Sequence, residues 1–437
     1  MRETLDLDLL IRAPRAIVDG REIAVAVGVR AGRIVHLGSF DAAAEAGEVV
    51  ELGSDEVLIP GLVDTHVHVN EPGRTEWEGF ASATRAAEAG GITTIIDMPL
   101  NSIPPTVDVD ALEIKREVAA DQSVVNVGFW GGAVPGNLEQ LRPLHDAGVF
   151  GFKCFLLHSG VDEFPPLSLP ELEKALIEIA SFDGLMIVHA EDAGVISSSP
   201  QPVGTAYAGF LESRPRAAEN LAISQVIELS RRTGCRVHIL HLSSSDVLPM
   251  IATARRDGVR VTAETCPHYL CFDAEDIPAG ATQFKCCPPI REAGNRELLW
   301  QGLSDGIIDT IVTDHSPSTV DLKRLDTGNF GDAWGGIASL QVSLPAVWTE
   351  ASRRGFDLAD VVRWMATNTA DQVGLTDRGR IAVGAVADLV VFAPDEEFTV
   401  DVARLHHKNA VTAYDQLGLR GLVRRTWLAG ASLLVRG

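Results

Sequence analysis

The chain of 437 residues contains no long apolar run and has few basic residues. No stretch reaches about 18 apolar residues, the length that crosses a bilayer as a helix. Lys and Arg number 37 against 60 Asp and Glu, which gives a formal net charge of −23. So acidic a chain is not suited to bind nucleic acid or an anionic membrane surface. We therefore expect neither among its partners.

Cysteine is also scarce, and the six cysteines have no spacing typical of a disulfide framework. Cys266 and Cys271 make a poor zinc pair because no matching ligands accompany them. The first 20 residues carry acidic side chains where a secretory signal would be basic. These observations favour a reducing, cytoplasmic location.

Both ends of the chain alternate short apolar runs with turns, which is typical of a β-meander. Residues 1–58 and 382–437 show this pattern, and each segment is too small for a hydrophobic core of its own. We therefore predict one small β-sandwich domain built from both segments.

The middle of the chain, residues 59–381, alternates apolar strands with helical segments. Eight predicted strands lie in VLIPGLVDTHVHV, TTIIDMP, SVVNVGFWGG, GFKCFLL, LMIVHA, RVHILHL, RVTAETCPHYL and DTIVTDHSP. This order predicts an α/β fold, a (β/α)8 TIM barrel with its active site at the carboxyl ends of the strands. The Gly- and Asp-rich stretch at 317–336 is expected to form a lid.

Side chains able to bind metal gather at the ends of these strands. His66 and His68 end the first strand, and residues two apart on a strand point to the same side. His189 ends the fifth strand and Asp314 the eighth. A lone histidine in a strand is more often a core residue, but several such groups meeting at one barrel end favour a centre for zinc or another divalent metal.

The sixth strand, RVHILHL, offers two histidines. His238 and His241 lie three positions apart and should face opposite sides, so only one is expected to point inward. Periodicity does not choose between them. We favour His241, which is nearer the end of the strand, and expect His238 to pack beneath a helix.

Lys153 interrupts the apolar run GVFGFKCFLL. A buried lysine loses its proton readily, and the neutral amine can add carbon dioxide to form a carbamate, which is a carboxylate on a long arm. The alternative is a lysine that pairs with an acid in the core. No acid precedes Lys153 on its own strand, so we favour the carbamate, which could bridge two cations.

Asp314 follows an apolar strand and is the candidate catalytic residue. Its carboxylate can bind a metal and also take a proton from water, whereas the alternative role is to cap the next helix. His315 and Ser316 come directly after it and either contact substrate or begin a helix. Asp64 is predicted to orient a metal-binding histidine, with a strand-end turn as the alternative.

Seven motifs resemble the cyclic amidohydrolases of the amidohydrolase superfamily: GLVDTHVHVNEPG, GFKCFL, MIVHAED, VHILHLSSS, ETCPHYL, KCCPPIR and VTDHSP. The resemblance covers nearly the whole chain, and it implies a homo-oligomer, with a tetramer expected first. It also implies a binuclear centre of two divalent ions, with zinc expected first and cobalt, manganese or iron also possible. The implied ligands are His66, His68, carboxylated Lys153, His189, His241 and Asp314.

Within that family, the stretches EPGRTEWEGFASATRAAEAGGITTIIDMPLNSIPPTV, HSGVDEFP, PPIRE and DAWGGIASLQ look like the allantoinases. This likeness implies that a hydroxide shared by two metals opens the hydantoin ring amide of allantoin to give allantoate, with Asp314 passing the proton to the leaving nitrogen. Asn101, Cys287 and Ser316 match positions that contact substrate. Asn70, also a candidate contact, stands where dihydroorotases carry an arginine for the substrate carboxylate.

Three alternatives remain. The chain could be a hydantoinase or dihydropyrimidinase acting on other cyclic ureides, or a dihydroorotase. It could also be a non-catalytic assembly protein on the same barrel, although such proteins have typically lost metal ligands that this chain retains.

Overall fold

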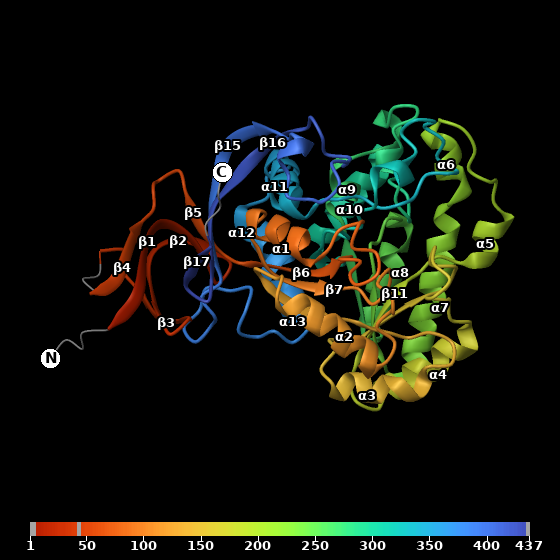
Figure 1. Ribbon diagram of the computed structural model, residues 1–437, viewed down its shortest axis with the longest axis horizontal. Helices are drawn as coiled ribbons and strands as arrows, with labels where there is room; N and C mark the ends of the chain where they lie inside the picture. The colour runs from red at the N-terminus through yellow and green to blue at the C-terminus, as the bar shows by residue number, and fades with distance from the viewer. Residues whose placement is uncertain (1–5, 42–44, 434–437) are drawn as a thin grey trace.

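The computed structural model describes residues 6–41 and 45–433 and places them in two parts, a small β-domain and a barrel (Figure 1). The ends of the predicted β-domain, residues 1–5 and 434–437, and residues 42–44 lie outside the described part. In Figure 1 the red strands from the start of the chain and the blue strands from its end lie side by side. The predicted domain built from both chain ends is therefore confirmed.

One sheet runs through the small domain in the order β17-β16-β15-β5-β1-β2-β3, with β4 beside β1. Its strands are β1 (Leu7–Val18), β2 (Arg21–Arg30), β3 (Arg33–Gly38), β4 (Ala46–Glu51), β5 (Val57–Pro60), β15 (Leu389–Thr399), β16 (Gly418–Leu428) and β17 (Ala431–Leu433). The join between the two segments is the antiparallel pair β5–β15, in which Leu58 faces Val391. Both side chains belong to the domain's own core, which also contains Trp427. The division at 58/59 and 381/382 stays a prediction.

The barrel strands are parallel and carry the candidate site at their carboxyl ends. They are β6 (Leu62–Val67), β7 (Ile92–Asp97), β8 (Asn126–Phe129), β9 (Gly131–Gly132), β10 (Phe152–Phe155), β11 (Leu185–His189), β12 (Arg236–Ile239), β13 (Val261–Thr265) and β14 (Thr310–Ile311). They form two ladders, β6-β7-β8 and β9-β10-β11-β12-β13-β14. A single parallel bridge between Val67 and His315 joins β6 to the segment after β14. The TIM barrel is therefore confirmed.

The third predicted strand is broken at Trp130, which separates β8 from β9. The backbone N–H of Trp130 donates to the carbonyl of Asp97 at 3.0 Å, and its indole N–H donates to the carbonyl of Thr65 at 2.8 Å. These bonds turn a large ring into the barrel interior, where it is 1% exposed. The strand pattern gave no sign of this break, because it depends on partners in two other strands.

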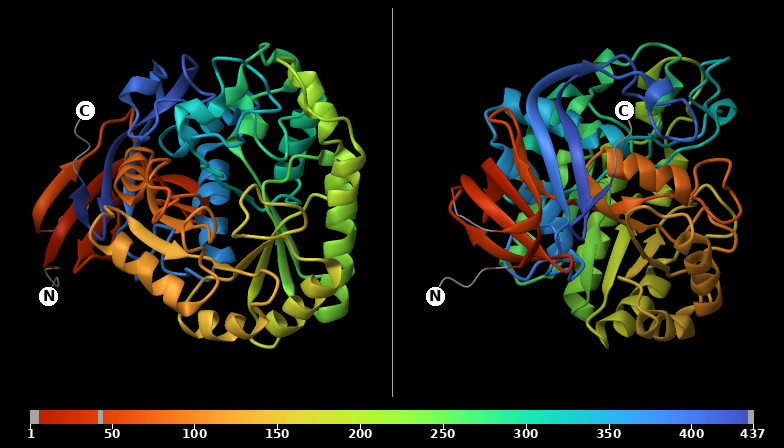
Figure 2. Two further views of the ribbon diagram at one scale, coloured as in Figure 1. Left: turned by 45° about the vertical axis from the view of Figure 1, so that its right-hand side comes forward. Right: turned by 60° about the vertical axis from the view of Figure 1, so that its left-hand side comes forward.

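Helices cover the outside of the barrel, and Figure 2 shows the long α7 running along it. They are α1 (Phe80–Ala89), α2 (Val109–Ala120), α3 (Leu141–Asp146), α4 (Leu169–Ala180), α5 (Ala193–Ser198), α6 (Tyr207–Ser213), α7 (Arg216–Thr233), α8 (Leu248–Arg256), α9 (Pro267–Cys271), α10 (Ala293–Ser304), α11 (Ser343–Arg353), α12 (Leu358–Val362) and α13 (Asn368–Gln372). Local signals set their ends: α4 begins with a capping box in which Ser168 and Glu171 bond reciprocally. Among the described helices, none is long and apolar enough to cross a membrane.

Candidate metal centre

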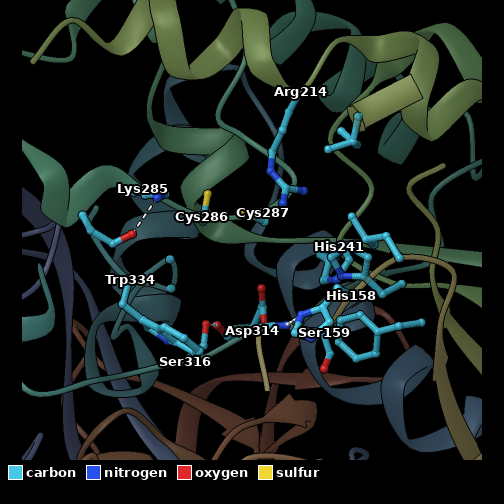
Figure 3. A pocket seen from close by; sticks show the side chains of 18 of the residues that line it. His158, Ser159, Arg214, His241, Lys285, Cys286, Cys287, Asp314, Ser316 and Trp334 are labelled. Atoms are coloured by element: carbon cyan, nitrogen blue, oxygen red, sulfur yellow. Dashed lines mark hydrogen bonds between the residues drawn. The ribbon is translucent and has the colours of Figure 1, made fainter. Parts of the chain in front are cut away.

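The six predicted ligands meet at the carboxyl ends of the barrel strands. His66 lies in β6 and His68 just after it, Lys153 lies in β10, His189 ends β11, His241 follows β12, and Asp314 follows β14. All except His66, which is fully buried, line a cavity of about 390 Å³. Figure 3 shows His241 and Asp314 at this cavity, with Arg214 reaching toward it from the other side.

The closest contacts among these residues surround Asp314. Its Oδ1 lies 3.1 Å from His66 Nε2 and 3.6 Å from His68 Nε2. Lys153 Nζ lies 3.4 Å from the same His66 Nε2, and the His241 ring lies 5.4 Å from the His66 ring between centroids. Ligand atoms of His66, His68 and Asp314 all fall within 4.8 Å of one another. Such convergence of imidazole nitrogens and a carboxylate is suited to a cation.

Backbone strain marks the places where strands turn into the site. His241 and Asp314 have φ of +36° and +44°, and Asn70 and Asn101 each have φ of +67°. Residues other than glycine seldom adopt such values, which cost about 1–3 kcal/mol each. The turn at each position breaks the two-residue alternation of the strand and aims the side chain independently of it.

The two histidines of the sixth strand are both inside the barrel, contrary to the prediction that only one points inward. β12 ends at Ile239, and the turn at His241 follows, so alternation no longer relates the pair. His238 Nδ1 lies 2.7 Å from Thr262 Oγ1, and its Nε2 lies 3.0 Å from Glu264 Oε2. The expectation that His238 packs beneath a helix is therefore wrong. His241 is the one that lines the cavity.

Glu264 in β13, which the sequence pattern did not single out, holds His66. Its Oε1 lies 2.5 Å from His66 Nδ1 and accepts the backbone N–H of His241 at 3.1 Å. Burial alone would raise the pKa of Glu264, but His66 and His238 lower it to about 2. A carboxylate on Nδ1 keeps the ring proton there and leaves the Nε2 lone pair for a cation. Alternation in VTAET, which puts Thr262 and Glu264 on one face, was the only local signal.

His189 is oriented by a second buried carboxylate. Its Nε2 lies 2.7 Å from Glu191 Oε2, and Arg214 donates to the same oxygen. Burial would raise the pKa of Glu191, but Arg214 and His189 lower it to about 2. An N–H donated from Nε2 leaves Nδ1 of His189 as the free acceptor. The motif HAED contains this glutamate two residues after the histidine.

The electrostatic environment fits a divalent cation. Burial lowers the pKa of His68, His189 and His241, so these rings are neutral near pH 7, the form that binds metals. Within the described part of the chain, His241 Nδ1 is buried without a hydrogen-bond partner. A buried polar atom of this kind costs free energy unless something binds to it. The donor set, with its tautomers held by Glu264 and Glu191, therefore suits a metal.

Lys153 is 1% exposed, between Phe152 and Cys154, which are fully buried. Among the described residues no carboxylate lies within ion-pair distance of its Nζ, whereas the equally buried Lys115 pairs with Asp97 at 2.7 Å. Burial lowers the pKa of Lys153 to about 8. At that value about one tenth of the amine is neutral at pH 7, and this fraction is the form that carbamate formation requires.

A second group of ligand types, Cys266, His268 and Asp314, also lies within 4.8 Å. Neither ring nitrogen of His268 has a hydrogen-bond partner among the described residues, and burial lowers its pKa to about 4. Because Asp314 is common to both groups, this one is an extension of the same site.

Three of the four predicted substrate contacts line the cavity, namely Asn101, Cys287 and Ser316. Asn101 Nδ2 lies 3.5 Å from His68 Nδ1, and the Ser316 hydroxyl donates to the carbonyl of Asp314 at 2.8 Å. Both side chains therefore lie directly beside candidate ligands.

Asn70 and Asp64 instead stabilise the backbone around the site. Asn70 is not among the residues that line the cavity; its Nδ2 faces the carbonyl of Pro317 at 3.5 Å. Asp64 accepts the backbone N–H of His66 at 3.0 Å and that of Thr313 at 3.2 Å, and burial raises its pKa to about 6. Asp64 thus contacts the main chain of His66, whereas Glu264 contacts its ring.

His315 is fully buried behind the cavity. Its Nδ1 accepts the backbone N–H of Ser339 at 3.0 Å, and its Nε2 lies 3.2 Å from Glu78 Oε2. The carbonyl of His315 accepts the backbone N–H of His68 at 2.8 Å. His315 therefore fixes the segment that carries Asp314 against the end of β6, where His66 and His68 lie.

The stretch predicted as a lid, residues 317–336, is packed against the barrel. It contains the 3-10 turn Val320–Lys323 and contributes Ala333, Trp334, Gly335 and Gly336 to the cavity lining. Trp334 meets Trp77 at 5.0 Å between ring centroids. The segment forms a side wall of the cavity.

Fold and site together define a TIM-barrel protein with a candidate metal centre at the carboxyl ends of its strands, and known proteins share this plan. The model of the amidohydrolase family matches residues 57–430. An allantoinase of Streptomyces avermitilis is 58% identical over 99% of this chain and 96% of that relative. An allantoinase of Saccharomyces cerevisiae is 49% identical over 85% of this chain and 82% of that relative. The chain belongs to the amidohydrolase family.

A solved structure agrees with this assignment. The L-hydantoinase (dihydropyrimidinase) from Arthrobacter aurescens superposes with a TM-score of 0.93 at 29% identity, covering 99% of this chain and 97% of that one. The likeness therefore extends over the small β-domain as well as the barrel.

Replacing Glu264 by glutamine is expected to weaken metal binding by about 10- to 100-fold, because the amide no longer holds the Nδ1 proton of His66 with a full negative charge. Competition with a chromophoric chelator would measure the metal affinity of the variant. Glu275→Gln, which changes an exposed acid that caps a surface helix, is the control. Wild-type affinity in Glu264→Gln would show that Glu264 does not tune His66.

Proposed function

We propose that the protein is an allantoinase, which hydrolyses the hydantoin ring amide of allantoin to allantoate in ureide catabolism. The observation that carries the proposal is the 58% identity, along 99% of the chain, to a protein named allantoinase. The six candidate ligands come together at one cavity, which supports an intact catalytic site.

We propose two divalent metal ions per subunit, with zinc first and cobalt, manganese or iron also compatible with the donors. When bound, such ions activate water near neutral pH and polarise the carbonyl that is attacked. The proposed ligands are His66, His68, His189, His241, Asp314 and Lys153 carboxylated at Nζ. The position of Lys153 Nζ, 3.4 Å from His66 Nε2, supports this role because it puts the end of the side chain among the ligand atoms.

Asp314 is the proposed catalytic residue, which takes a proton from the attacking water and gives it to the departing ring nitrogen. Burial would raise the pKa of Asp314, but His66, His241 and His68 lower it well below its usual value. Asp314 is therefore a carboxylate at neutral pH, the form that accepts a proton. Asn101, Cys287 and Ser316 are proposed to hold the ring, and Asn70 to support the loop beside them.

The second candidate is a hydantoinase or dihydropyrimidinase, favoured by the superposition on the Arthrobacter aurescens enzyme. Dihydroorotase is less well supported because Asn70 stands where an arginine would hold the substrate carboxylate. A non-catalytic assembly protein is the least supported, since all six ligand positions are filled.

We further propose a cytoplasmic homo-oligomer, a tetramer by resemblance to the family. None of the six cysteines, all within the described residues, forms a disulfide, which supports a reducing compartment. We retain the division into 1–58 plus 382–437 and 59–381 as the proposed domain boundaries.

A substrate panel with metal analysis tests the function. Zinc-loaded protein is expected to carry about two ions per chain and to open allantoin at least about 100-fold more efficiently than dihydrouracil, dihydroorotate or 5-alkyl hydantoins. Chelation should abolish activity, and added zinc should restore it. Faster opening of dihydrouracil or alkyl hydantoins would replace the proposal by the second candidate. Fewer than about one ion per chain would favour the assembly protein.

A further inference from the structure

Two lysines beside the cavity are buried without an acidic partner. Lys285 is 8% exposed and Lys323 is 3% exposed. Among the described residues no carboxylate lies within ion-pair distance of either ammonium, in contrast to Lys115 with its partner Asp97. A buried ammonium is costly unless its N–H groups are hydrogen-bonded, so the partners of these two lysines are informative.

Both lysines bind the backbone of one short stretch, residues 330–336, which we call the wall segment. Their ammonium groups contact the carbonyl oxygens of Phe330, Gly331, Ala333, Trp334 and Gly336. Lys285 contacts the first three, including Ala333 at 2.6 Å, and Lys323 contacts the last two, including Trp334 at 3.2 Å. The backbone N–H of Gly336 also donates to the carbonyl of Lys285 at 2.8 Å.

The wall segment forms one side of the cavity together with two candidate substrate contacts. In Figure 3, Lys285, Trp334 and Ser316 lie in the left part of the view, whereas His241 and His158 lie in the right part. Gly336 has φ of +125°, and a Cβ there would lie 2.1 Å from the carbonyl oxygen of Ser316. A Cβ at Gly335 would lie 3.6 Å from the Sγ of Cys287. A shift of the wall segment would therefore change the shape of the substrate site.

We propose that Lys285 and Lys323 are positioning residues that, as ammonium ions, fix the wall segment as one side of the substrate site. The inference rests on the proposed function, because the ligand concerned is the cyclic ureide. An ammonium has three donors and no acceptor, and a carbonyl only accepts, so every contact is attractive. A neutral amine has one donor fewer, so Lys285 could no longer donate to all three of its carbonyls, and the two bonds of Lys323 would lose the strength that the positive charge gives them. Loss of either charge therefore releases part of the segment.

The charge on Lys285 and Lys323, which together we call the clamp on the wall segment, depends on pH. Burial lowers the pKa of Lys285, and it lowers the pKa of Lys323 to about 8. Lys323 is faced by Lys285, Cys286 and Cys287, and Lys285 is faced by Cys287, Arg214 and Asp332. With its pKa at about 8, Lys323 is mostly protonated at pH 7 and loses its proton as the pH rises through that value. The hold on the wall segment is thus stronger at pH 7 than at pH 9.

The test uses Lys285→Met and Lys323→Met, which keep the length of the side chain and remove the charge. Hydrogen exchange by mass spectrometry at pH 7 should show faster exchange of residues 330–336 in both variants. The KM for allantoin should rise about tenfold or more, the size of a lost charge-assisted hydrogen bond, with a smaller change in kcat and wild-type metal content. The KM difference between wild type and Lys323→Met should narrow at pH 9.

Arg324→Met is the matched control, since it removes a neighbouring cation that is paired with Asp326 at the surface. Its exchange and KM should match the wild type. Wild-type exchange of residues 330–336 in both lysine variants would overturn the clamp, whether or not the protein opens allantoin. Proportional losses of kcat, metal and thermal stability would also overturn it, by assigning the lysines to general stability. Failure of the wild type to open allantoin would instead reject the proposed function.

Discussion

Lys153→Ala is expected to lose metal binding and to open allantoin about 1,000-fold more slowly or worse. The variant lacks the arm that carries the proposed carbamate, and stabilisation worth several kcal/mol corresponds to losses of this size. Elemental analysis of protein prepared with zinc, together with kcat/KM for allantoin, would measure both effects. Lys153→Met, which fills the same volume without a buried charge, should fold and show the same defect.

A carbamate can be distinguished from an ammonium at the same position. A short carboxylate such as acetate or propionate should restore part of the activity of Lys153→Ala, because it replaces the missing oxygens in the space left by the side chain. Metal-free wild type should reload faster with bicarbonate present, and labelled bicarbonate should give a carbamate carbon resonance. Native activity in Lys153→Ala would rule out the proposed role of the lysine.

Asp314→Asn is expected to lower kcat by about 10²–10⁴-fold, the range attributed to general acid–base groups. The amide has nearly the same size but cannot accept a proton, so a carbonyl oxygen remains beside His66 and His68 without the base. Steady-state kinetics with metal content measured on the same samples would separate the proton-transfer role from the ligand role.

Asp162→Asn is a suitable control for that variant, because Asp162 is a fully exposed carboxylate that pairs with His158 beside the cavity. Its kcat should stay within about twofold of wild type, as for most exposed substitutions. If Asp314→Asn kept kcat within tenfold while binding metal normally, another group would have to carry the proton.

The fold could be predicted where local pattern decides structure. Alternating strands and helices indicated the barrel, and turn-rich apolar runs indicated the β-domain. The break at Trp130 could not be predicted, because it depends on bonds to Asp97 and Thr65 in other strands. Closure of the barrel through His315 could not be predicted either. β14 has only two residues, and the closing bridge joins Val67 in β6 to His315, which lies after β14.

The part of the site that could be predicted from the sequence is the set of candidate ligands at the ends of apolar strands. Candidate ligands such as His66 and His189 end apolar runs, and the structure brings them together at the carboxyl ends of the strands, although their roles stay a prediction. Their supporting carboxylates could not be assigned in the same way. Glu264 in β13 contacts His66 in β6, and these strands are brought together only by closure of the barrel; His238 reaches Glu264 because β12 neighbours β13. Contacts across strands depend on closure, which alternation along one strand does not describe.

The pairing of β5 with β15 has a consequence for synthesis of the chain. β5 ends at Pro60 and β15 begins at Leu389, so the ribosome must add more than 300 residues before the partner strand exists. At about 5–20 residues per second, β5 waits for roughly 15–65 s with one edge exposed. An open strand edge invites pairing with other nascent chains. The early strands of this protein are therefore where a chaperone would have most to protect.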